Sequence, residues 1–463
     1  MKNFFGLLCA LLLLLSPAVT LSVRAMDEID LKSQTAVLMD LDTGQVLYSK
    51  DMKRRIYPAS TTKVLTALVV LENSRPYEVV TVNQSAVDSI TWNSSHIALT
   101  EGEQFTVDSG LYALMLPSAN DAANALAEHI AGSQEVFADM MNARARDIGA
   151  LDTHFTNAHG LHDDNHYTTA YDMALITRYA MQNDLFQTYF GTARYTMPPT
   201  NKNHERPFTN YQYQLVQETG YYNPSVVGGK VGYTEEAQHT MTTVARRGDR
   251  TLVCTVMGSP SRGDKFDDTE KLLEFGFTEF VPYSIPKASF SGFQAPVLEG
   301  EQVVGSATFY ADRDFTALLH NDVNPDDVAV IFQKPQALAV SSPVECCVIF
   351  EATASPAMVP AALGEVHLTA DVNLSSIPVM TQEVQLSPGF VKHPLFRKAA
   401  IGAVVVLLMI VLLIACRRYQ IRKKRKARLN RLAQKRKEAE LRPAVPYHSL
   451  SSRAPRDGRT RTG

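Results

Sequence analysis

The stretch Tyr57-Pro58-Ala59-Ser60-Thr61-Thr62-Lys63 opens the largely apolar run 64–71. Pro58 stands where a helix usually begins, and neither glycine nor proline interrupts the run that follows. We therefore expect a buried helix that starts near Ser60. Ser60 and Lys63 are three residues apart, so they share one face of the first turn of this helix.

This spacing suits nucleophilic catalysis. A serine hydroxyl is a poor nucleophile until a base takes its proton, and a lysine can be that base where burial and the positive end of a helix lower its pKa. The backbone N–H of Ser60 would then be available to hold an oxyanion. The alternative is that Ser60 merely caps the helix, because serine is a favoured cap. The tetrapeptide alone leaves both interpretations open.

Length and charge limit the possible classes of protein. The chain has 463 residues, more than one ordinary domain, so we expect two or three units. The formal net charge is −3, but about the last fifty residues are strongly basic, which leaves the rest acidic. An acidic main body argues against binding to nucleic acid. The 5 cysteines lack the spacing of a disulfide framework or a zinc site.

The N-terminal residues 1–25 are predicted to be a secretory signal peptide. Lys2 supplies a positive start, residues 7–15 an apolar core, and Val23-Arg24-Ala25 a cleavage site with small residues. The apolar core is short for a membrane span, which favours cleavage over an uncleaved anchor.

A second apolar run, 399–416, is long enough to cross a bilayer, and we predict a transmembrane helix over 396–416. Many Lys and Arg residues follow directly in the tail 417–463. Since positive residues stay in the cytoplasm, the catalytic domain is expected outside it, on a membrane-anchored chain with a C-terminal single span. The basic tail is expected to be disordered or to lie against anionic lipid.

Between these segments the pattern indicates two folded domains. We assign residues 26–281 to an α/β (α+β) domain, in which an antiparallel sheet is flanked by helices, and residues 282–392 to a small all-β domain. A short helix over 271–275 is expected to end at Gly276. The expected strands are 35–40, 45–49, 226–234, 240–245 and 251–257 in the first domain, with 303–310 and 328–332 in the second.

Two further segments of the first domain carry polar residues. Ser118 and Asn120 stand on the turn before the predicted helix 122–130, where either could simply cap it. The strand 226–234 is rich in glycine, which often marks the close approach of another backbone, and Lys230 within it is expected to face a ligand.

The loop 155–167 contains three histidines and two aspartates, which invites a metal hypothesis. However, Gly160 and the polar run indicate a loop, and the spacing fits no common zinc pattern. We expect no metal site here and no cofactor.

Taken together, three motifs in this order resemble the penicillin-binding, active-site-serine peptidases. The resemblance covers roughly residues 31–280 and is strongest to the low-molecular-mass D-alanyl-D-alanine carboxypeptidases, peptidase family S11. The three motifs are Ser60-Thr61-Thr62-Lys63, Ser118-Ala119-Asn120 and Lys230-Val231-Gly232. Segments with closer similarity to the family are Pro117-Ser118-Ala119-Asn120-Asp121-Ala122-Ala123, His166-Tyr167-Thr168-Thr169-Ala170-Tyr171-Asp172 and Gly232-Tyr233-Thr234.

The resemblance implies a serine-transpeptidase/β-lactamase-like fold and a D-Ala-D-Ala carboxypeptidase that acts on peptidoglycan stem peptides, with β-lactam antibiotics as covalent inhibitors. Ser60 would attack the carbonyl between the two D-alanines, and Lys63 would accept its proton. Ser118 would pass that proton toward the leaving D-alanine, and Asn120 would hold the substrate amide.

On the facing strand, the resemblance gives Lys230 two roles: it makes the local potential more positive and helps to bind the substrate carboxylate. The N–H groups of Ser60 and Tyr233 would form the oxyanion hole, and water would hydrolyse the acyl-enzyme.

Two positions depart from the family pattern, and both concern the substrate carboxylate. Val231 stands where the family usually has a threonine hydroxyl, unless Thr234 supplies that group instead. Lys265, with Arg262 nearby, stands where the family often has an arginine, and lysine cannot make arginine's bidentate contact. Substrate affinity therefore depends on how this chain compensates for both changes.

The same motifs are compatible with two other functions. Class A β-lactamases share the three motifs but need a glutamate on the loop between the second and third motifs, and residues 159–167 contain none. A non-catalytic wall-binding protein is the other alternative, favoured by Val231 and Lys265 alone.

Overall fold

In the computed structural model, the described residues are 29–374, apart from 92, 292, 300, 334–337, 340–345, 354 and 357. The predicted signal peptide, the end of the predicted β domain, the predicted membrane span 396–416 and the basic tail all lie outside these residues. Within the described part of the chain, no helix is both long and apolar enough to cross a membrane.

The central sheet of the described chain has five antiparallel strands in the order β2-β1-β9-β8-β7. The N-terminal hairpin therefore pairs with the strand of this sheet that comes last in the sequence, with Thr35 opposite Met257. The antiparallel sheet predicted from the sequence is confirmed. Its strands are β1 (Thr35–Asp40), β2 (Val46–Lys50), β7 (Val226–Thr234), β8 (Gln238–Arg247) and β9 (Arg250–Ser259).

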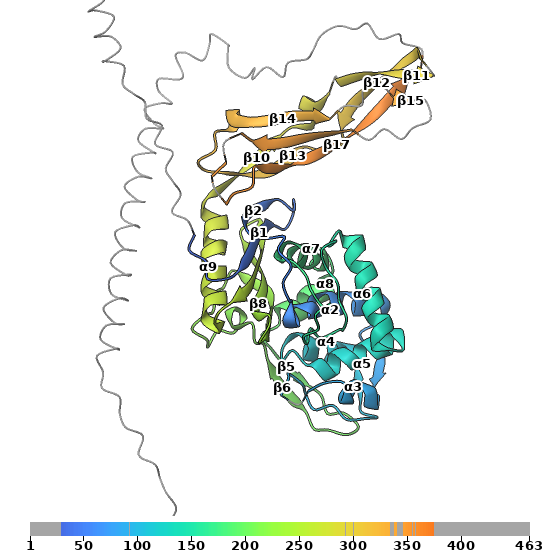
Figure 1. The fold of residues 1–463 in the computed structure, drawn as a ribbon, viewed down its shortest axis with the longest axis vertical. Coiled ribbons are helices and arrows are strands. Elements are labelled where there is room, and N and C mark those ends of the chain that lie inside the picture. The colour runs from blue at the N-terminus through green and yellow to red at the C-terminus, as the bar shows by residue number, and fades with distance from the viewer. Residues whose placement is uncertain are drawn as a thin grey trace, which may run out of the picture. The chain divides into compact units, whose positions relative to one another are not determined.

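A long helical segment is inserted between β2 and β7 and covers one face of the sheet, while α9 (Arg262–Thr278) covers the other (Figure 1). The inserted helices are η1 (Ala59–Thr62), α2 (Lys63–Asn73), α3 (Gln84–Asp88), α4 (Val107–Met115), α5 (Asn120–Ala131), α6 (Gln134–Ile148), α7 (Ala170–Ala180), α8 (Asp184–Gly191) and the short η2 (Tyr213–Leu215).

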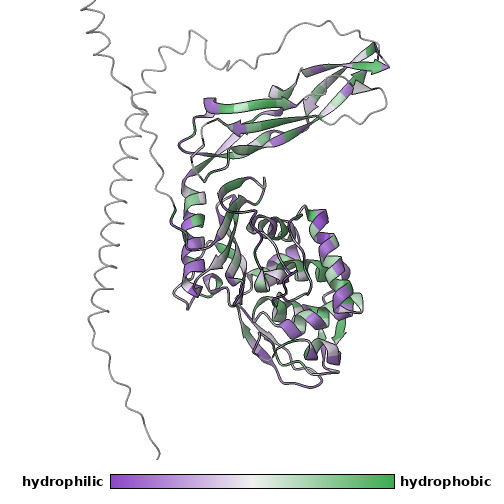
Figure 2. Cartoon of the chain, viewed as in Figure 1, coloured by the Kyte–Doolittle hydropathy of each residue, from purple (hydrophilic) through white to green (hydrophobic). Residues whose placement is uncertain are grey.

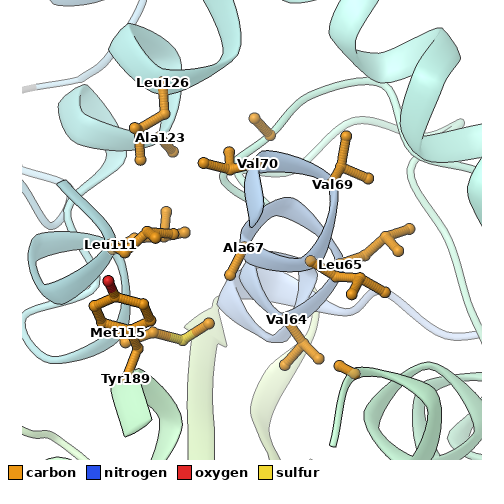
Figure 3. Close-up of a cluster of buried hydrophobic side chains, with 14 of the residues drawn as sticks. Val64, Leu65, Ala67, Val69, Val70, Leu111, Met115, Ala123, Leu126 and Tyr189 are labelled. Atoms are coloured by element: carbon orange, nitrogen blue, oxygen red, sulfur yellow. The ribbon is translucent and has the colours of Figure 1, made fainter. Parts of the chain in front are cut away.

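Helix α2 is the centre of the larger hydrophobic core. Every residue from Lys63 to Val70 is buried, as expected for a helix that is apolar on all sides. Figure 3 shows its valines and leucines surrounded by neighbouring helices, with Leu111 and Met115 of α4 on one side and Leu126 of α5 above them. This packing fixes the position of the turn that precedes α2.

The sequence-based prediction for α9 was wrong in its bounds. The helix runs over Arg262–Thr278, not 271–275, and it does not end at Gly276. A Cβ at Gly276 would lie 2.6 Å from a Leu38 methyl and 2.7 Å from a Leu252 methyl, so glycine serves close packing of the helix on the sheet here and not termination. Polar and apolar residues both occur along α9 in Figure 2, as expected for a helix with one face on a sheet.

Two short hairpin-like pairs at the edge of the helical segment were not predicted. Their strands are only three or four residues long, too short to show a clear alternation. They are β3 (Val79–Thr81) with β4 (Gln104–Thr106), and β5 (Arg194–Met197) with β6 (Arg206–Thr209).

Beyond α9 the described chain is almost entirely β-structure. A two-stranded sheet pairs β10 with β13, and a second sheet has the order β14-β16-β17-β12-β11-β15 around a core that includes Phe309, Phe315 and Phe350. The domain boundary proposed at residue 281 falls inside β10 and stays a prediction. The elements are β10 (Phe280–Ile285), η3 (Lys287–Phe290), β11 (Phe293–Glu299), β12 (Gln302–Ala311), β13 (Phe315–His320), η4 (Pro325–Asp327), β14 (Val328–Gln333), β15 (Leu338–Ala339), β16 (Cys347–Ala352) and β17 (Ala362–Asn373).

Candidate active site

Ser60 lies on the 3₁₀ turn η1 directly before α2. No side chain caps this turn, so the interpretation of Ser60 as a helix cap is excluded. Ala59, the residue before it, has a φ of 48°, in the left-handed region that alanine seldom adopts. Lys63 follows one turn later, and its Nζ is 3.0 Å from the Ser60 Oγ. The predicted serine–lysine pair is therefore in direct contact.

Lys63 is fully buried and surrounded by uncharged acceptors. Its Nζ donates to the Asn120 Oδ1 at 2.7 Å and to the backbone carbonyl of His159 at 2.6 Å. Burial and, next, the charge of Lys230 hold the pKa of Lys63 well below its usual range, and Asp121 acts in the opposite direction. A neutral amine at this position is the state that can accept a proton.

Ser118 and Asn120 approach from the start of α5. Neither is a helix cap, because the N-cap of α5 is Ala119 and no side chain caps it. Ser118 has a φ of 64°, a strained conformation that turns its hydroxyl toward Lys230, whose Nζ donates to the Ser118 Oγ at 2.9 Å. The second predicted motif thus contacts the first through Asn120 and the third through Ser118.

The strand β7 brings the third motif against the Ser60 turn. Lys230 is buried, and burial together with the charge of Lys265 lowers its pKa to about 7. Two residues along, a Cβ on Gly232 would lie 2.7 Å from the Ser60 backbone nitrogen. Only glycine allows the strand to come this close, so the backbone around Tyr233 runs beside Ser60.

The two residues that depart from the family pattern are Val231 on β7 and Lys265 on α9. Val231 belongs to the hydrophobic cluster between the sheet and α9, together with Phe266. Lys265 is buried on α9, with its Nζ 5.1 Å from the centre of the Phe266 ring. Burial and the neighbouring Arg262 lower the pKa of Lys265 to about 8.

The last two predicted site residues lie at the exposed end of β7. The Tyr233 side chain is exposed and packs against the His239 ring, with 4.5 Å between ring centres. The Thr234 Oγ1 accepts the N–H of Ala237 at 3.0 Å. The Thr234 hydroxyl is therefore engaged in the turn that follows β7.

The histidines of the loop 155–167 are used to shape that loop. Asn157 accepts the N–H groups of His159 and Gly160, which presents the His159 carbonyl to Lys63. The His166 ring contacts Thr62. Within the described residues, no three His, Cys, Asp or Glu side chains are grouped so that they could hold a metal ion.

Sequence reasoning missed the carbonyl of His159, since any residue can supply a backbone acceptor. It also missed Asp121, which is buried and accepts the N–H groups of Ile97, Leu99 and Ala122. Asp121 thereby fixes a loop at the start of α5. An acidic residue directly after Asn120 was the available signal, but helix starts commonly carry one.

Comparison with known proteins agrees with this geometry. The family model of D-alanyl-D-alanine carboxypeptidase, peptidase family S11, matches residues 22–261. The chain is 31% identical over 274 residues to the D-alanyl-D-alanine carboxypeptidase DacF of Bacillus subtilis (strain 168), covering 58% of this chain and 69% of DacF. It is 35% identical over 256 residues to DacB2 of Mycobacterium tuberculosis (strain ATCC 25618 / H37Rv), covering 53% of this chain and 82% of DacB2.

Penicillin binding protein 5 from Haemophilus influenzae has a similar fold, with a TM-score of 0.60 and 26% identity over 74% of this chain and 98% of that chain. With Ser60, Lys63, Ser118, Asn120 and Lys230 brought into mutual contact on a mixed α/β fold, these likenesses lead to one conclusion. The chain belongs to the D-alanyl-D-alanine carboxypeptidases of peptidase family S11 and is a serine peptidase.

Proposed function

We propose that this chain removes the terminal D-alanine of peptidoglycan stem peptides through an acyl-enzyme on Ser60. The observation that carries the proposal is the set of contacts around Lys63 Nζ. A neutral amine has two N–H groups and one lone pair. Asn120 Oδ1 and the His159 carbonyl can only accept, so they take the two N–H groups. The lone pair is left for the third neighbour, the Ser60 hydroxyl.

In acylation, Ser60 Oγ attacks the carbonyl of the bond between the two D-alanines while its proton passes to Lys63. The bond to the leaving D-alanine breaks once its nitrogen is protonated. Ser118 is the group that delivers this proton, and Lys230, whose Nζ contacts Ser118 Oγ, stabilises negative charge on that path.

The oxyanion is held by the backbone N–H groups of Ser60 and Tyr233. The close approach of Gly232 to the Ser60 nitrogen supports this pairing, because it places the next residue of β7 beside the serine. Water then attacks the ester, and Lys63, again neutral, removes a proton from that water. Splitting the reaction into two steps lowers the barrier of each.

The terminal carboxylate of the substrate is expected to meet Lys265. Lys265 is buried, and among the described residues no acceptor lies within hydrogen-bonding distance of its ammonium group. A buried cation without an anion is costly, and a bound carboxylate would relieve that cost. Val231 offers no hydroxyl to the same carboxylate, which weakens but does not remove this contact.

The same proposal includes the cell envelope. A cleaved signal peptide over 1–25, a separate small β domain over 282–392 and a C-terminal span over 396–416 would hold the catalytic domain at the outer face of the cytoplasmic membrane, with the tail 417–463 inside. The apolar run and the basic residues after it support this location. There the enzyme would act in peptidoglycan biosynthesis and cell shape, and β-lactams would acylate Ser60.

Labelling with a fluorescent penicillin, followed by mapping of the modified peptide, tests nucleophile and family together. Ser60→Ala is expected to abolish both the label and the release of D-alanine from a stem-peptide mimic. The exposed Ser85 provides a matched control, and Ser85→Ala should behave as the parent. A Ser60→Ala protein that is still labelled at another serine would refute the assignment.

A further inference from the structure

The His166 ring is buried directly beneath the turn that carries Ser60. Its Nε2 is 2.8 Å from the Thr62 Oγ1, and its Nδ1 is 3.1 Å from the backbone nitrogen of Thr156. The ring also packs edge-on against Phe155, with 5.3 Å between ring centres. None of the catalytic steps above uses this histidine.

These contacts determine which ring nitrogen carries the proton. The backbone N–H of Thr156 can only donate, so Nδ1 accepts. The Thr62 Oγ1 has a single proton, and it donates this proton to the Ala59 carbonyl at 2.8 Å, which can only accept. Nε2 must therefore be the donor to Thr62. Both contacts specify the same neutral tautomer.

The Ala59 carbonyl is one end of a rigid peptide unit whose other end is the Ser60 N–H. Because a trans peptide is planar, fixing the carbonyl fixes the N–H in the opposite direction. Each end is closely approached by a glycine. A Cβ on Gly160 would lie 1.9 Å from the Ala59 oxygen, and a Cβ on Gly232 would lie 2.7 Å from the Ser60 nitrogen.

We propose that His166 is a positioning residue: through the Thr62 hydroxyl and the Ala59 carbonyl, it orients the peptide unit that aims the Ser60 N–H at the oxyanion. The proposal rests on the function proposed above and adds two residues to it. The unusual φ of Ala59, 48°, shows why such a hold is needed, since alanine would relax from this conformation if nothing held its carbonyl.

The ring works only in its neutral form, because a second proton on Nδ1 would point at the Thr156 N–H. The surroundings favour that form. Burial lowers the pKa of His166 to about 3, Asp163 opposes this shift, and the charges of His154, Lys63 and His162 add to it.

The test compares two variants at each position. Thr62→Ser keeps the hydroxyl that Thr62→Val lacks, and His166→Gln keeps a hydrogen-bond donor and acceptor that His166→Phe lacks. Thr62→Val and His166→Phe should be acylated by a fluorescent penicillin about 10- to 100-fold more slowly, which is part of the loss caused by removing an oxyanion donor. Thr62→Ser and His166→Gln keep one donor and one acceptor each and should stay within about threefold of the parent.

Stem-peptide kinetics separate this role from a structural one. A misdirected oxyanion donor lowers kcat and leaves KM nearly unchanged, because the contact is made in the transition state. Circular dichroism checks that each variant is folded. If His166→Phe unfolds, the comparison of Thr62→Val with Thr62→Ser still tests the proposed positioning role. Folded Thr62→Val with the parent's acylation rate would overturn the inference, and so would Thr62→Ser as slow as Thr62→Val. A parent protein that is not labelled at Ser60 would instead refute the proposed function.

Discussion

Lys63 and Lys265 are both buried lysines, but they lie on opposite sides of the central sheet in different surroundings. Lys63 has three oxygen neighbours within 3.0 Å, supplied by Ser60, Asn120 and His159. Lys265 has the face of Phe266 beside it and, within the described part of the chain, no acceptor. Burial is the main cause of a lowered pKa in both.

The difference shows how the two sides of the site are specified. The side that performs the covalent chemistry is assembled without substrate, since the side chains of Lys63 and Ser118 already have polar partners. The side that would bind the substrate carboxylate is incomplete, because the Lys265 ammonium group has no anionic partner among the described residues. Substitutions around Lys63 should therefore change the rate of chemistry, whereas substitutions around Lys265 should change substrate affinity.

The largest effect is expected at Lys63. Lys63→Arg keeps a positive charge but cannot give up its proton, so acylation should fall by at least ~10³-fold. Stopped-flow acylation with a chromogenic β-lactam measures this. Lys287→Arg, at an exposed lysine, is the matched control. A rate close to that of the parent would remove Lys63 from the role of base.

At Lys265 the expected effect is on KM. Lys265→Met keeps the length of the side chain without its charge, and KM for a D-Ala-D-Ala peptide should rise by about 10- to 100-fold with little change in kcat. Lys265→Arg should keep or lower KM, because arginine binds a carboxylate with two N–H groups. Equal KM values for the parent and Lys265→Met would show that the carboxylate binds elsewhere.

The Lys265 pair also predicts a pH dependence. The pKa of Lys265 is lowered to about 8, so its positive charge is lost as pH rises through that value. KM of the parent should therefore increase between pH 7 and 9, while KM of Lys265→Arg should increase less because arginine remains charged. Parallel profiles for the two proteins would contradict this assignment.

A substitution at Val231, on the side that would bind the carboxylate, is expected to give a smaller effect, a gain in kcat/KM. Val231→Thr supplies the missing hydroxyl without changing the strand, since both residues are branched at Cβ. We expect kcat/KM on D-Ala-D-Ala peptides to rise by several-fold to about a hundredfold, and Tm to change little. An unchanged or lower kcat/KM would mean that position 231 does not contact the carboxylate.

A final prediction concerns stability on the Lys63 side. The pKa of His166 is about 3 in the folded protein and near the usual histidine value of 6.5 when the chain is unfolded. The unfolded chain therefore takes up a proton first, and stability is lost as pH falls from 6.5 toward 3. Each pH unit in that window costs up to ~1.4 kcal/mol.

His166→Gln has no such proton, and all other groups are shared with the parent. Urea unfolding at pH 6.5 and 5 should show the parent losing about 1.6 kcal/mol more than His166→Gln. Equal losses of unfolding free energy in the two proteins would mean that the His166 ring is charged or solvated in the folded protein, which contradicts the neutral buried ring.

The sequence was sufficient to predict the sheet and the order of the three motifs, because both are local patterns. The short runs of mostly apolar residues in 35–40 and 251–257 indicated strands, and the spacing of Ser60 and Lys63 predicted that they share one face of a helix turn. What could not be predicted depends on tertiary packing. Gly276 has the pattern of a helix end, yet the neighbouring leucines make it a packing residue within α9.

The second group of missed features involves backbone atoms and strained torsion angles. No residue type reveals that the His159 carbonyl accepts from Lys63, or that Ala59 and Ser118 adopt positive φ values. The sequence places His166 in a histidine-rich loop and at the start of a family-like segment, but neither pattern indicates a role for its ring. Its role becomes visible when the direction of each hydrogen bond from Thr62 is known.

The pairing of β1 with β9 has a consequence for how the enzyme is made. Thr35 pairs with Met257, so β1 cannot join β9 in the central sheet until almost the whole domain has been synthesised. A nascent chain that ends before β7 already carries Ser60 and Lys63, but it lacks the strand that lies against them. The active site around Ser60 is therefore completed late, and a partly synthesised chain has no catalytic activity.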